Sequence, residues 1–394
     1  MAALPANFTL LQVIPDLGAG GAEQTTLDVA RAVVAAGGRA IVASRGGRMT
    51  AELRARGGEL RVLPVHTKNP ITMLANRGRL AALIRTEGVS LVHVRSRAPA
   101  FAAFAAASDA GVPAIATYHG LYSSGNALKR WYNSVMTRGL ITIANSGFTA
   151  KHIIAEHALD PARVVAIPRG VDLARFDPAA VAPERIAALE AAWALPPRGA
   201  ALRFLLAGRL TRWKGQMLAI EAAARLVAER RLDFRIVMVG DDQGRSGYRQ
   251  ALAREIRARR LADRIVLAGH CDDMPAAYLA ADVALAPSLE PEAFGRTAVE
   301  PQAMARPVIA SRLGAPAETV VAGETGWLIQ PGDAKSLAVA MAASMDAGPA
   351  RRAAMGQAAK ERARRLYSVE AMCEATLAAY ARVLEFSAGG QKAA

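Results

Sequence analysis

Short apolar segments alternate with helical patterns along most of the chain, and this alternation restricts the possible fold more than any other feature. Near the N-terminus, "FTLLQVIP" is typical of a buried strand, "AEQTTLDVARAVVAAGG" of a helix that ends at glycine, and "RAIVAS" of the next strand. Further strand-like segments follow in chain order: "LRVLPV", "SLVHVRS", "AIATYHG", "LITIANS", "RVVAIPRG", "LRFLLAG", "DFRIVMVG", "RIVLAGH", "DVALAPS", "RPVIAS" and "GWLIQ". Continuous apolar strands separated by helices are typical of parallel sheets that helices cover on both faces.

These segments form two series, and the proline-rich residues 178–200 separate them. A chain of 394 residues is too long for one ordinary core and fits two domains of about 180 to 200 residues each. We therefore predict an α/β protein with two Rossmann-like, doubly wound domains, one over residues 1–180 and one over residues 198–368. A last amphipathic pattern at about residues 369–386 predicts a helix that packs back onto the first domain.

The composition argues against several classes of protein. Although 52% of the residues are hydrophobic, much of this fraction is alanine, and no apolar run reaches the roughly 18 to 20 residues that span a bilayer. The N-terminus lacks the basic region of a signal peptide, so we expect none. Cys271 and Cys373 lie far apart without metal-ligand spacing, which predicts neither a disulfide nor a metal site and suits the cytoplasm.

The chain is strongly basic, with a formal net charge of +15. The excess is concentrated in residues 1–180, which hold 20 Lys and Arg against 11 Asp and Glu. Such a surface can attract nucleic acid, an anionic membrane surface or a phosphorylated substrate. A solvated surface in an arginine-rich proteome explains the total charge at least as well.

In open parallel sheets ligands bind beyond the carboxyl ends of the strands, and the polar residues of interest follow strand-like segments. After the first strand, "DLGAGGAE" places Gly18, Gly20 and Gly21 before a helix, whose N-terminus favours negative charge. The full G-x-G-x-x-G spacing is absent. The second strand also ends in "VASRGG", without the acidic residue that holds a ribose in dinucleotide enzymes. Both features argue against a dehydrogenase.

Two loops of the second series combine cations, backbone N–H groups and carboxylates. The loop "GRLTRWKG" holds Arg209 and Lys214, which can neutralise a diphosphate or can simply be solvated. In "PEAFGRTAVE", backbone N–H groups of residues 294–297 can face an anion at the start of a helix. The flanking carboxylates can accept hydrogen bonds from sugar hydroxyls, a hexose at Glu292 and a ribose at Glu300, although Glu300 can instead be a capping or solvated residue.

Over nearly its whole length, the chain resembles retaining glycosyltransferases of the GT-B fold, in the large group called family 4. The matching segments are "GAGGAE", "YHG", "ANSGFTAKHI", "IPRGVDLARFDP", "GRLTRWKG", "EAFGRTAVE" and "GAPAE…GETGWLI". Each can arise by chance, but the ordered set is specific. The resemblance implies two Rossmann-like domains facing across a cleft, with the nucleotide sugar bound by the second.

The resemblance also implies a set of site residues, namely Gly20, Gly21, His119, Arg209, Lys214, Glu292, Phe294, Gly295, Arg296, Thr297 and Glu300. Arg209 and Lys214 would bind the diphosphate and stabilise its departure, a task that a metal performs in other transferases. Glu292 would contact the sugar and Glu300 the ribose, while the glycine loop would close over the phosphates. His119 would face the reacting sugar through its backbone carbonyl or at the C6 hydroxyl, unless it is a packed structural histidine.

The implied reaction is front-side transfer with retention. The acceptor hydroxyl would lose its proton to a donor phosphate oxygen, and no carboxylate near His119 stands out as a nucleophile. No cofactor is implied beyond the nucleotide-diphosphate sugar, which is the donor substrate.

Two departures limit the resemblance. Where many relatives have Asn-Gly-Val-Asp, this chain has "PRGVD", with Arg169 either reaching an acceptor phosphate or making a surface ion pair. Pro301 follows Glu300 directly, which predicts that the helix begins close to Arg296, because proline is tolerated only near a helix start.

Acceptor residues are expected in the first domain. Arg95 and Arg97 follow a strand, and Lys68 lies in a basic segment, so we predict that they bind a carboxylate or phosphate together with Arg169. The segment "NALKRWYNSVMTRG" interleaves cations with aromatic residues and is suited either to an anionic membrane interface or to an ordinary packed helix.

The sequence favours an anionic glycolipid as the acceptor, because the chain also resembles transferases that build lipopolysaccharide cores. The enzyme would then be cytoplasmic, with peripheral contact to the inner membrane. Alternatives are a same-fold transferase with a soluble sugar-phosphate acceptor and a nucleotide-sugar epimerase. A nucleic-acid binder would explain the charge but not the ordered residues at strand ends, so we expect no nucleic-acid partner.

Overall fold

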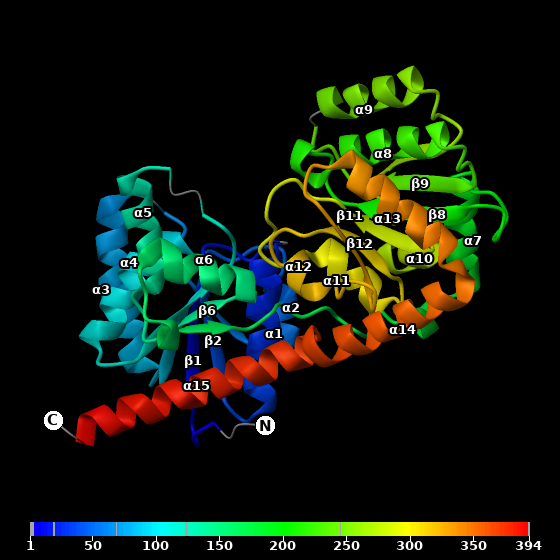
Figure 1. Ribbon diagram of the computed structural model, residues 1–394. Helices are drawn as coiled ribbons and strands as arrows, with labels where there is room; N and C mark the ends of the chain where they lie inside the picture. The colour runs from blue at the N-terminus through cyan, green and yellow to red at the C-terminus, as the bar shows by residue number, and fades with distance from the viewer. Residues whose placement is uncertain (1–3, 19, 68, 123–124, 245, 393–394) are drawn as a thin grey trace. The chain divides into compact units, whose positions relative to one another are not determined.

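The computed structural model describes residues 4–18, 20–67, 69–122, 125–244 and 246–392. The chain divides into two compact units, each of which is considered by itself (Figure 1). Met1–Gly170 and Val369–Ala394 form the first unit, and Val171–Ser368 form the second. The predicted α/β class with two doubly wound units is confirmed.

The first unit holds, within the described residues, one parallel sheet with the strand order β3-β2-β1-β4-β5-β6-β7. The strands are β1 (Thr9–Val13), β2 (Arg39–Ser44), β3 (Glu59–Val62), β4 (Leu91–Val94), β5 (Ala114–Tyr118), β6 (Thr142–Ala144) and β7 (Val164–Ala166). The strand order reverses between β1 and β4, which is where doubly wound sheets open a crevice for ligands.

The second unit repeats this pattern with the parallel order β10-β9-β8-β11-β12-β13 among the residues that the structure describes. The strands are β8 (Leu202–Ala207), β9 (Phe234–Val239), β10 (Ile265–Gly269), β11 (Val283–Ala286), β12 (Val308–Ser311) and β13 (Gly326–Ile329). The order reverses between β8 and β11. Each strand-like segment predicted from the sequence overlaps one of these strands, and β3 begins one residue before its predicted segment.

Helices connect the strands and cover both faces of each sheet (Figure 1). Those of the first unit are α1 (Gly21–Ala35), α2 (Thr50–Ala55), α3 (Pro70–Thr86), α4 (Arg97–Asp109), α5 (Ala127–Ser134), α6 (Gly147–His157) and α15 (Val369–Lys392). Those of the second unit are α7 (Pro183–Ala192), α8 (Gln216–Ala228), α9 (Ser246–Ala258), α10 (Met274–Ala280), α11 (Arg296–Ala303), α12 (Pro316–Thr319), α13 (Ala334–Asp346) and α14 (Gly348–Leu366).

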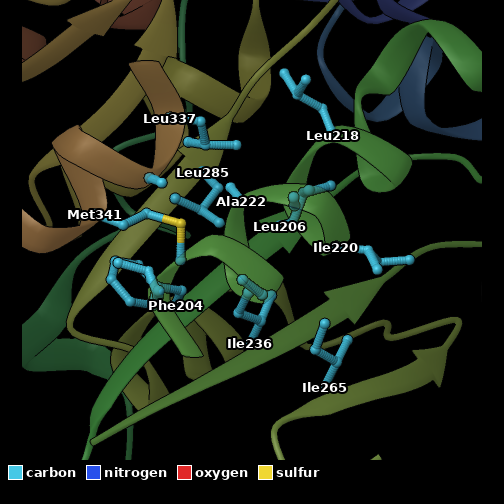
Figure 2. Close-up of a cluster of buried hydrophobic side chains, with 14 of the residues drawn as sticks. Phe204, Leu206, Leu218, Ile220, Ala222, Ile236, Ile265, Leu285, Leu337 and Met341 are labelled. Atoms are coloured by element: carbon cyan, nitrogen blue, oxygen red, sulfur yellow. The ribbon is translucent and has the colours of Figure 1, made fainter. Parts of the chain in front are cut away.

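The two faces of each sheet have separate cores, because successive residues of a strand point to opposite faces. In β1, Leu10 packs in a cluster with α1, α2 and α15, whereas Leu11 packs in a cluster with α3, α4 and α6. In the second unit, Phe204 of β8 packs against Met341 of α13 on one face, as Figure 2 shows. Leu205, the next residue, packs with α10 and α11 on the other face.

The boundary between the units follows residue 170, so the predicted linker at residues 178–200 was wrong. This segment belongs to the second unit, where α7 packs against α10. Trp193 is buried in the same core cluster of the second unit as Leu205, and Glu190 forms an ion pair of 2.7 Å with the buried Arg203. The proline content suggested a linker, but these long-range contacts make the segment part of a domain.

Helix α15 belongs to the first unit, packs against α1, and extends to Lys392, beyond the predicted end at residue 386. Its Tyr380 hydroxyl lies 2.6 Å from Nδ1 of the buried His93 in β4. The other ring nitrogen of His93, Nε2, lies 2.7 Å from the Thr117 hydroxyl of β5. This buried polar chain therefore links the C-terminal helix to the centre of the first sheet.

The buried histidine predicts that stability decreases in mild acid. Burial, followed by the charge of Arg95, holds the pKa of His93 well below its ordinary value. Below about pH 6.5 the unfolded chain binds a proton that folded His93 does not, so the free energy of unfolding decreases as the pH falls toward the folded pKa. We expect about 1.4 kcal/mol per pH unit from His93 in this window.

Urea unfolding between pH 7.5 and pH 5.5 measures this contribution. The loss of stability with decreasing pH should be smaller in His93→Gln than in wild type. Equal slopes in wild type and His93→Gln would contradict the assignment. The comparison uses slopes, so a constant destabilisation by the substitution does not matter.

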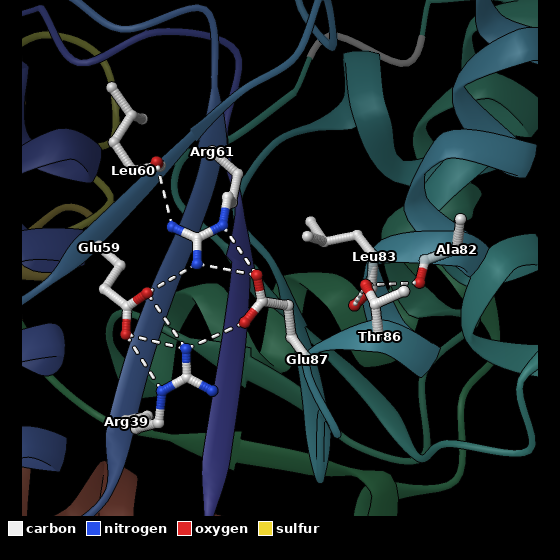
Figure 3. Close-up of polar contacts among 8 residues, drawn as sticks. All are labelled: Arg39, Glu59, Leu60, Arg61, Ala82, Leu83, Thr86 and Glu87. Carbon is white, nitrogen blue, oxygen red and sulfur yellow. Dashed lines mark hydrogen bonds and ion pairs between the residues drawn. The ribbon is translucent and has the colours of Figure 1, made fainter.

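Part of the basic excess of the first unit is neutralised in an exposed network of four charges near the start of β2 and β3 (Figure 3). Arg39 lies 3.0 Å from both Glu59 and Glu87, and Arg61 lies 2.7 Å from Glu59 and 2.8 Å from Glu87. Hydrogen bonds from Arg39 and Arg61 lower the pKa of Glu87. Arg39 and Glu59 are the first residues of β2 and β3, so the network lies toward the amino ends of these strands, away from the edge where ligands bind.

Candidate functional site

The second unit brings Lys214 and Glu292 together at the carboxyl edge of its sheet. Lys214 follows β8 and Glu292 follows β11, the two strands between which the order reverses. Lys214 Nζ lies 2.8 Å from Glu292 Oε1, and each side chain is only 10% exposed. The sequence predicted both residues for one site, and the fold places their charged groups in contact across 78 positions of the chain.

The backbone around Glu292 is tightly held. Residue 292 forms an isolated parallel bridge with Gly314, and the Ala315 N–H donates to the Glu292 carbonyl at 2.9 Å. On the side chain, the Ser288 hydroxyl donates to Oε1, the same oxygen that Lys214 contacts. In the part of the chain that the structure describes, Oε2 has no recorded partner, so it remains able to accept a hydrogen bond from a ligand.

The two predicted cations of this loop differ in environment. Lys214 is 8% exposed, and its Nζ lies 4.5 Å from the centre of the Trp213 ring. Arg209 is exposed, and its backbone carbonyl accepts a hydrogen bond from Gln216. Among the described residues, its guanidinium has no carboxylate within 4.0 Å. Lys214 is thus a fixed buried charge, whereas Arg209 presents its charge to solvent.

Helix α11 begins at Arg296, as the sequence predicted, and Gly295 occupies the N-cap position without a side-chain cap. The first N–H groups of a helix have no partner within it, so those of Arg296 and Thr297 face outward from the helix end. Phe294 is buried and packs against the Tyr367 ring with centroids 6.2 Å apart. This anchored turn is suited to an anion, because the helix dipole adds positive potential there.

Glu300 is buried at 6% exposure, so the alternative of a solvated helix residue was wrong. The Tyr278 hydroxyl donates to its Oε2 at 3.1 Å, and Arg296 Nε donates to its Oε1 at 2.8 Å. Burial, followed by the Glu300 charge, raises the pKa of Tyr278 well above its ordinary value, so the phenol remains a donor. Arg296 Nη2 also lies 2.7 Å from Oε1, so Oε2 is the Glu300 oxygen that keeps a lone pair for a ligand hydroxyl.

Pro301 lies inside α11, at its sixth residue. Because proline has no N–H, the Thr297 carbonyl receives no helical hydrogen bond from this position. The helix nevertheless continues to Ala303, and Glu300 is held by Tyr278 and Arg296. The sequence analysis missed Tyr278 and Ser288, since neither lies within a motif that signals a sugar or phosphate site.

The first unit gathers another group of predicted residues at the carboxyl edge of its sheet. His119 follows β5, Asn145 follows β6 and Arg169 follows β7. Arg169 Nη2 lies 3.1 Å from both Nδ1 and the backbone oxygen of His119, and Asn145 Nδ2 donates to the same oxygen at 3.1 Å. Gly20 caps α1, and Gly21 begins it. Asn145 lies in the segment "ANSGFTAKHI", but the sequence predicted no role for it.

Arg169 contacts His119 through these two hydrogen bonds, a setting that the sequence did not predict. Its half-buried guanidinium also lies close to Gly21. Arg169 therefore belongs to the His119 group.

The predicted acceptor residue Arg95 is not on the surface. It is 2% exposed and donates to Gln12 Oε1 through Nε at 2.9 Å and through Nη2 at 2.5 Å. Its backbone N–H donates to Val13, so the strand pairing continues through residue 95 and directs the side chain into the unit. Burial lowers the pKa of Arg95. A buried guanidinium among Gln12 and Thr117 is a structural group of the sheet.

Arg97 is half-buried at the start of α4. Its Nη1 donates to Asn133 at 2.6 Å, and its guanidinium carbon lies 3.8 Å from the centre of the Tyr122 ring. Lys68, the remaining predicted acceptor residue, lies outside the described residues. The structure thus leaves Arg97 as the only one of this strand-end pair that is near the surface.

Among the described residues, no helix has both the length and the apolar character that a membrane span requires. In the same residues, no three His, Cys, Asp or Glu side chains gather into a group that could hold a metal ion.

Comparison with known families gives consecutive matches along the chain. Residues 19–175 match "Glycosyltransferase Family 4", and residues 192–362 match "Glycosyl transferases group 1". A crystal structure of a glycosyltransferase from Rickettsia africae is 31% identical, with a TM-score of 0.87, and the match covers 96% of this chain and 99% of that chain. Two doubly wound units with these strand orders define the GT-B class. Within that class, the chain belongs to glycosyltransferase family 4, so the predicted resemblance is confirmed.

A curated relative covers only part of the chain. The D-inositol 3-phosphate glycosyltransferase 2 of Catenulispora acidiphila is 37% identical over 250 residues, which are 62% of this chain and 56% of that protein. The matched segment therefore spans about half the length of this curated relative.

More distant solved structures share the fold. Anabaena Alr3699/HepE in complex with UDP-glucose is 23% identical with a TM-score of 0.76, over 95% of this chain and all of that chain. WaaG, a glycosyltransferase involved in lipopolysaccharide biosynthesis, is 15% identical with a TM-score of 0.67, over 93% and 98% of the two chains. At these identities the likeness concerns the fold alone.

Proposed function

We propose that this protein transfers a hexose from a nucleoside-diphosphate sugar to a soluble sugar phosphate, with retention of configuration. The observation that carries the proposal is the buried pair of Lys214 and Glu292, followed in the chain by the uncapped N-terminus of α11. A cation, free N–H groups and an oriented carboxylate are the groups that a sugar diphosphate needs at one strand edge.

The charge of the leaving group sets the roles of the two cations. As the bond between the anomeric carbon and the phosphate oxygen breaks, negative charge develops on the departing diphosphate. Lys214 is already desolvated and held at a fixed place, so it can stabilise this charge with little reorganisation. Arg209 adds a second cation from the exposed side of the loop.

The two carboxylates recognise hydroxyl groups of the donor. Glu292 offers Oε2 to the sugar, because Lys214 and Ser288 occupy Oε1. Glu300 offers the remaining lone pair of Oε2 to the ribose, while Tyr278 and Arg296 hold the carboxylate in place. Backbone N–H groups of residues 294–297 contact the phosphates and sugar between these carboxylates.

The transfer step needs no covalent nucleophile. The acceptor oxygen attacks the anomeric carbon on the face from which the diphosphate leaves, and the acceptor proton passes to a donor phosphate oxygen. The bond to the acceptor forms as the bond to phosphate breaks. Because both bonds lie on the same face of the sugar, the configuration is retained. The transferase reaction requires no metal in this proposal, since Arg209 and Lys214 supply the positive charge.

The choice of acceptor changes from the one preferred on the sequence alone. The Catenulispora relative is named for D-inositol 3-phosphate, whereas the lipopolysaccharide-linked WaaG is only 15% identical. These findings favour a soluble sugar phosphate over an anionic glycolipid. Arg97 and the segment around Lys68 remain the proposed binding residues for the acceptor phosphate.

One observation favours the glycolipid as a second candidate. On α5, the side chains of Leu128 and Trp131 are 73% and 55% exposed beside Lys129 and Arg130. Apolar side chains next to cations are typical of a helix that lies on an anionic membrane surface. Peripheral contact of the first unit with the inner membrane follows from this candidate.

A ligand panel followed by product analysis tests the proposal. UDP, GDP, ADP and their common sugar conjugates are added to wild type, Lys214→Ala and the exposed control Lys335→Ala, and the melting temperature is measured. Binding of one nucleotide at 100 times its Kd should add about 2.7 kcal/mol of stability in wild type and in the control. No shift with any nucleotide at millimolar concentration would overturn the donor site.

The selected donor is then incubated with sugar phosphates or with an anionic glycolipid fraction, and the products are identified by mass spectrometry. Transfer to a sugar phosphate without lipid supports the proposal. Transfer only to lipid replaces it with the second candidate, and conversion of the nucleotide sugar without any acceptor replaces it with an epimerase. Salt-sensitive binding of nucleic acid without nucleotide-sugar binding would restore the nucleic-acid alternative.

A further inference from the structure

The ring of His119 is held by one side chain. Arg169 Nη2 lies 3.1 Å from its Nδ1 and 3.1 Å from its backbone oxygen, so one guanidinium nitrogen serves both groups. Arg169 is the residue at which the "PRGVD" segment departs from the Asn-Gly-Val-Asp of many relatives. The departure therefore places a cation directly against the predicted catalytic histidine.

This contact determines which ring nitrogen of His119 carries the proton. A guanidinium has five N–H donors and no acceptor, so Nδ1 must accept the hydrogen bond from Arg169. In the neutral imidazole the proton then resides on Nε2. That atom is buried and has no hydrogen-bond partner in the described chain. The Nε2–H group is therefore a donor that a ligand can satisfy.

The backbone carbonyl of His119 is not equally available. It accepts from Arg169 Nη2 and from Asn145 Nδ2, both at 3.1 Å. A carbonyl oxygen has two lone pairs, and these two donors use both. Of the two contacts that the resemblance allowed, the one through the backbone carbonyl would require breaking an existing hydrogen bond. The contact through the side chain breaks none.

Arg169 is itself confined by the start of α1. A Cβ atom placed on Gly21 would lie 2.6 Å from Arg169 Nη1, which is too close for any real contact. A side chain at this position would therefore require the end of the Arg169 side chain to shift.

The charges that face His119 keep its ring neutral. Burial, followed by Arg169 and then Arg95, holds the pKa of His119 well below its ordinary value. His93 of β4 and its partners Thr117 of β5 and Tyr380 of α15 carry no charge when His93 is neutral. A neutral ring donates only through the nitrogen that bears its proton, so its tautomer decides its function.

From these contacts we infer that Arg169 is a positioning residue: it fixes His119 as the Nε2–H tautomer, so that this N–H can donate to a hydroxyl of a ligand at the carboxyl edge of the first sheet. The inference rests on the proposed transferase function for the ligand, but its structural part concerns the unliganded protein. Arg169 acts on the reaction only through His119.

Nuclear magnetic resonance of the full chain, labelled with ¹⁵N and ¹³C in its six histidines, tests the structural part. A His119→Asn variant assigns the ring signals. In wild type, His119 should stay neutral with its proton on Nε2 from pH 8 down to pH 5.5. In Arg169→Met, the pKa of His119 should rise because one of its causes of lowering is removed, although burial and Arg95 still lower it, and both tautomers should be populated.

Kinetics of the same variants test the functional part. Loss of one neutral hydrogen-bond arrangement should lower kcat in Arg169→Met by about three- to tenfold, with a smaller change in KM for the donor. Arg169→Lys keeps the charge but not the planar fork, and should recover part of the loss. Arg54→Gln, which removes an exposed arginine of α2, should behave as wild type.

The outcomes separate the two levels of the inference. A wild-type ring with its proton on Nδ1, or an unchanged His119 ring in Arg169→Met, would overturn the positioning role whatever the activity. If the His119 ring signals are as expected but no nucleotide sugar supports transfer, the positioning role of Arg169 is supported and the proposed function is rejected. If Arg169→Met does not fold, Gly21→Ala tests the same contact, because its methyl group would lie 2.6 Å from Arg169 Nη1 and require the guanidinium to shift, which should change the His119 ring signals.

Discussion

Replacing Lys214 with methionine should lower the rate of sugar transfer by about two to three orders of magnitude, the usual cost of losing one preorganised charge-stabilising group. The reason is the environment of Lys214, which is 8% exposed and contacts Glu292 at 2.8 Å. A cation that is already desolvated can stabilise a leaving diphosphate without first losing its own water. Steady-state kinetics with the donor identified in the ligand panel measure the effect.

The same substitution should also destabilise the second unit. It leaves the Glu292 carboxylate buried without its cation, which typically costs about 3 kcal/mol. The double variant Lys214→Met/Glu292→Gln removes both charges and should recover much of this stability without recovering activity. Recovery of activity in the double variant would contradict a direct role of Lys214 in the reaction.

Replacing Gly215 with alanine should destabilise the protein by about 3 kcal/mol and should also reduce transfer. Gly215 has φ +78°, and a Cβ atom there would lie 2.1 Å from the Pro287 carbonyl oxygen. The left-handed backbone costs a residue with a side chain about 1 kcal/mol, and moving apart two packed loops adds the larger share. The displaced loop carries Lys214, so its distance from Glu292 should increase.

A second glycine of the same unit isolates the backbone contribution. Gly332 has a similar φ of +75°, but a Cβ atom there would have no neighbour within 4 Å. Gly332→Ala should therefore cost only about 1 kcal/mol in urea unfolding and leave kinetics unchanged. Equal effects of the two substitutions would show that the contact between Gly215 and Pro287 does not matter.

The residues that meet at the carboxyl edge illustrate how far sequence reasoning reaches. Arg209, Lys214 and Glu292 were predicted because they directly follow strand-like segments, and strand direction alone brings such residues to one edge of a parallel sheet. Tyr278 and Ser288 were not predicted, although they hold Glu300 and Glu292. Their roles depend on side-chain packing between elements, which leaves no local pattern in the chain.

Arg95 shows the opposite failure. It follows a strand and was predicted at an accessible edge, but strand pairing continues through its N–H and the side chain turns inward to Gln12. An arginine at a strand end gives the same sequence pattern whether its side chain faces the solvent or the core. Only the position of its neighbours decides this, and they come from β1 and β5.

By itself the sequence determined the fold class, the positions of the strands, the family and the loops that carry the proposed donor site, since these depend on periodicity and on residue order along the chain. The tertiary structure decided that the domain boundary follows residue 170, that Arg95 is buried and that Arg169 contacts His119. The physical reason is distance: these features arise from contacts between residues far apart in the chain, such as the 50 positions that separate Arg169 from His119.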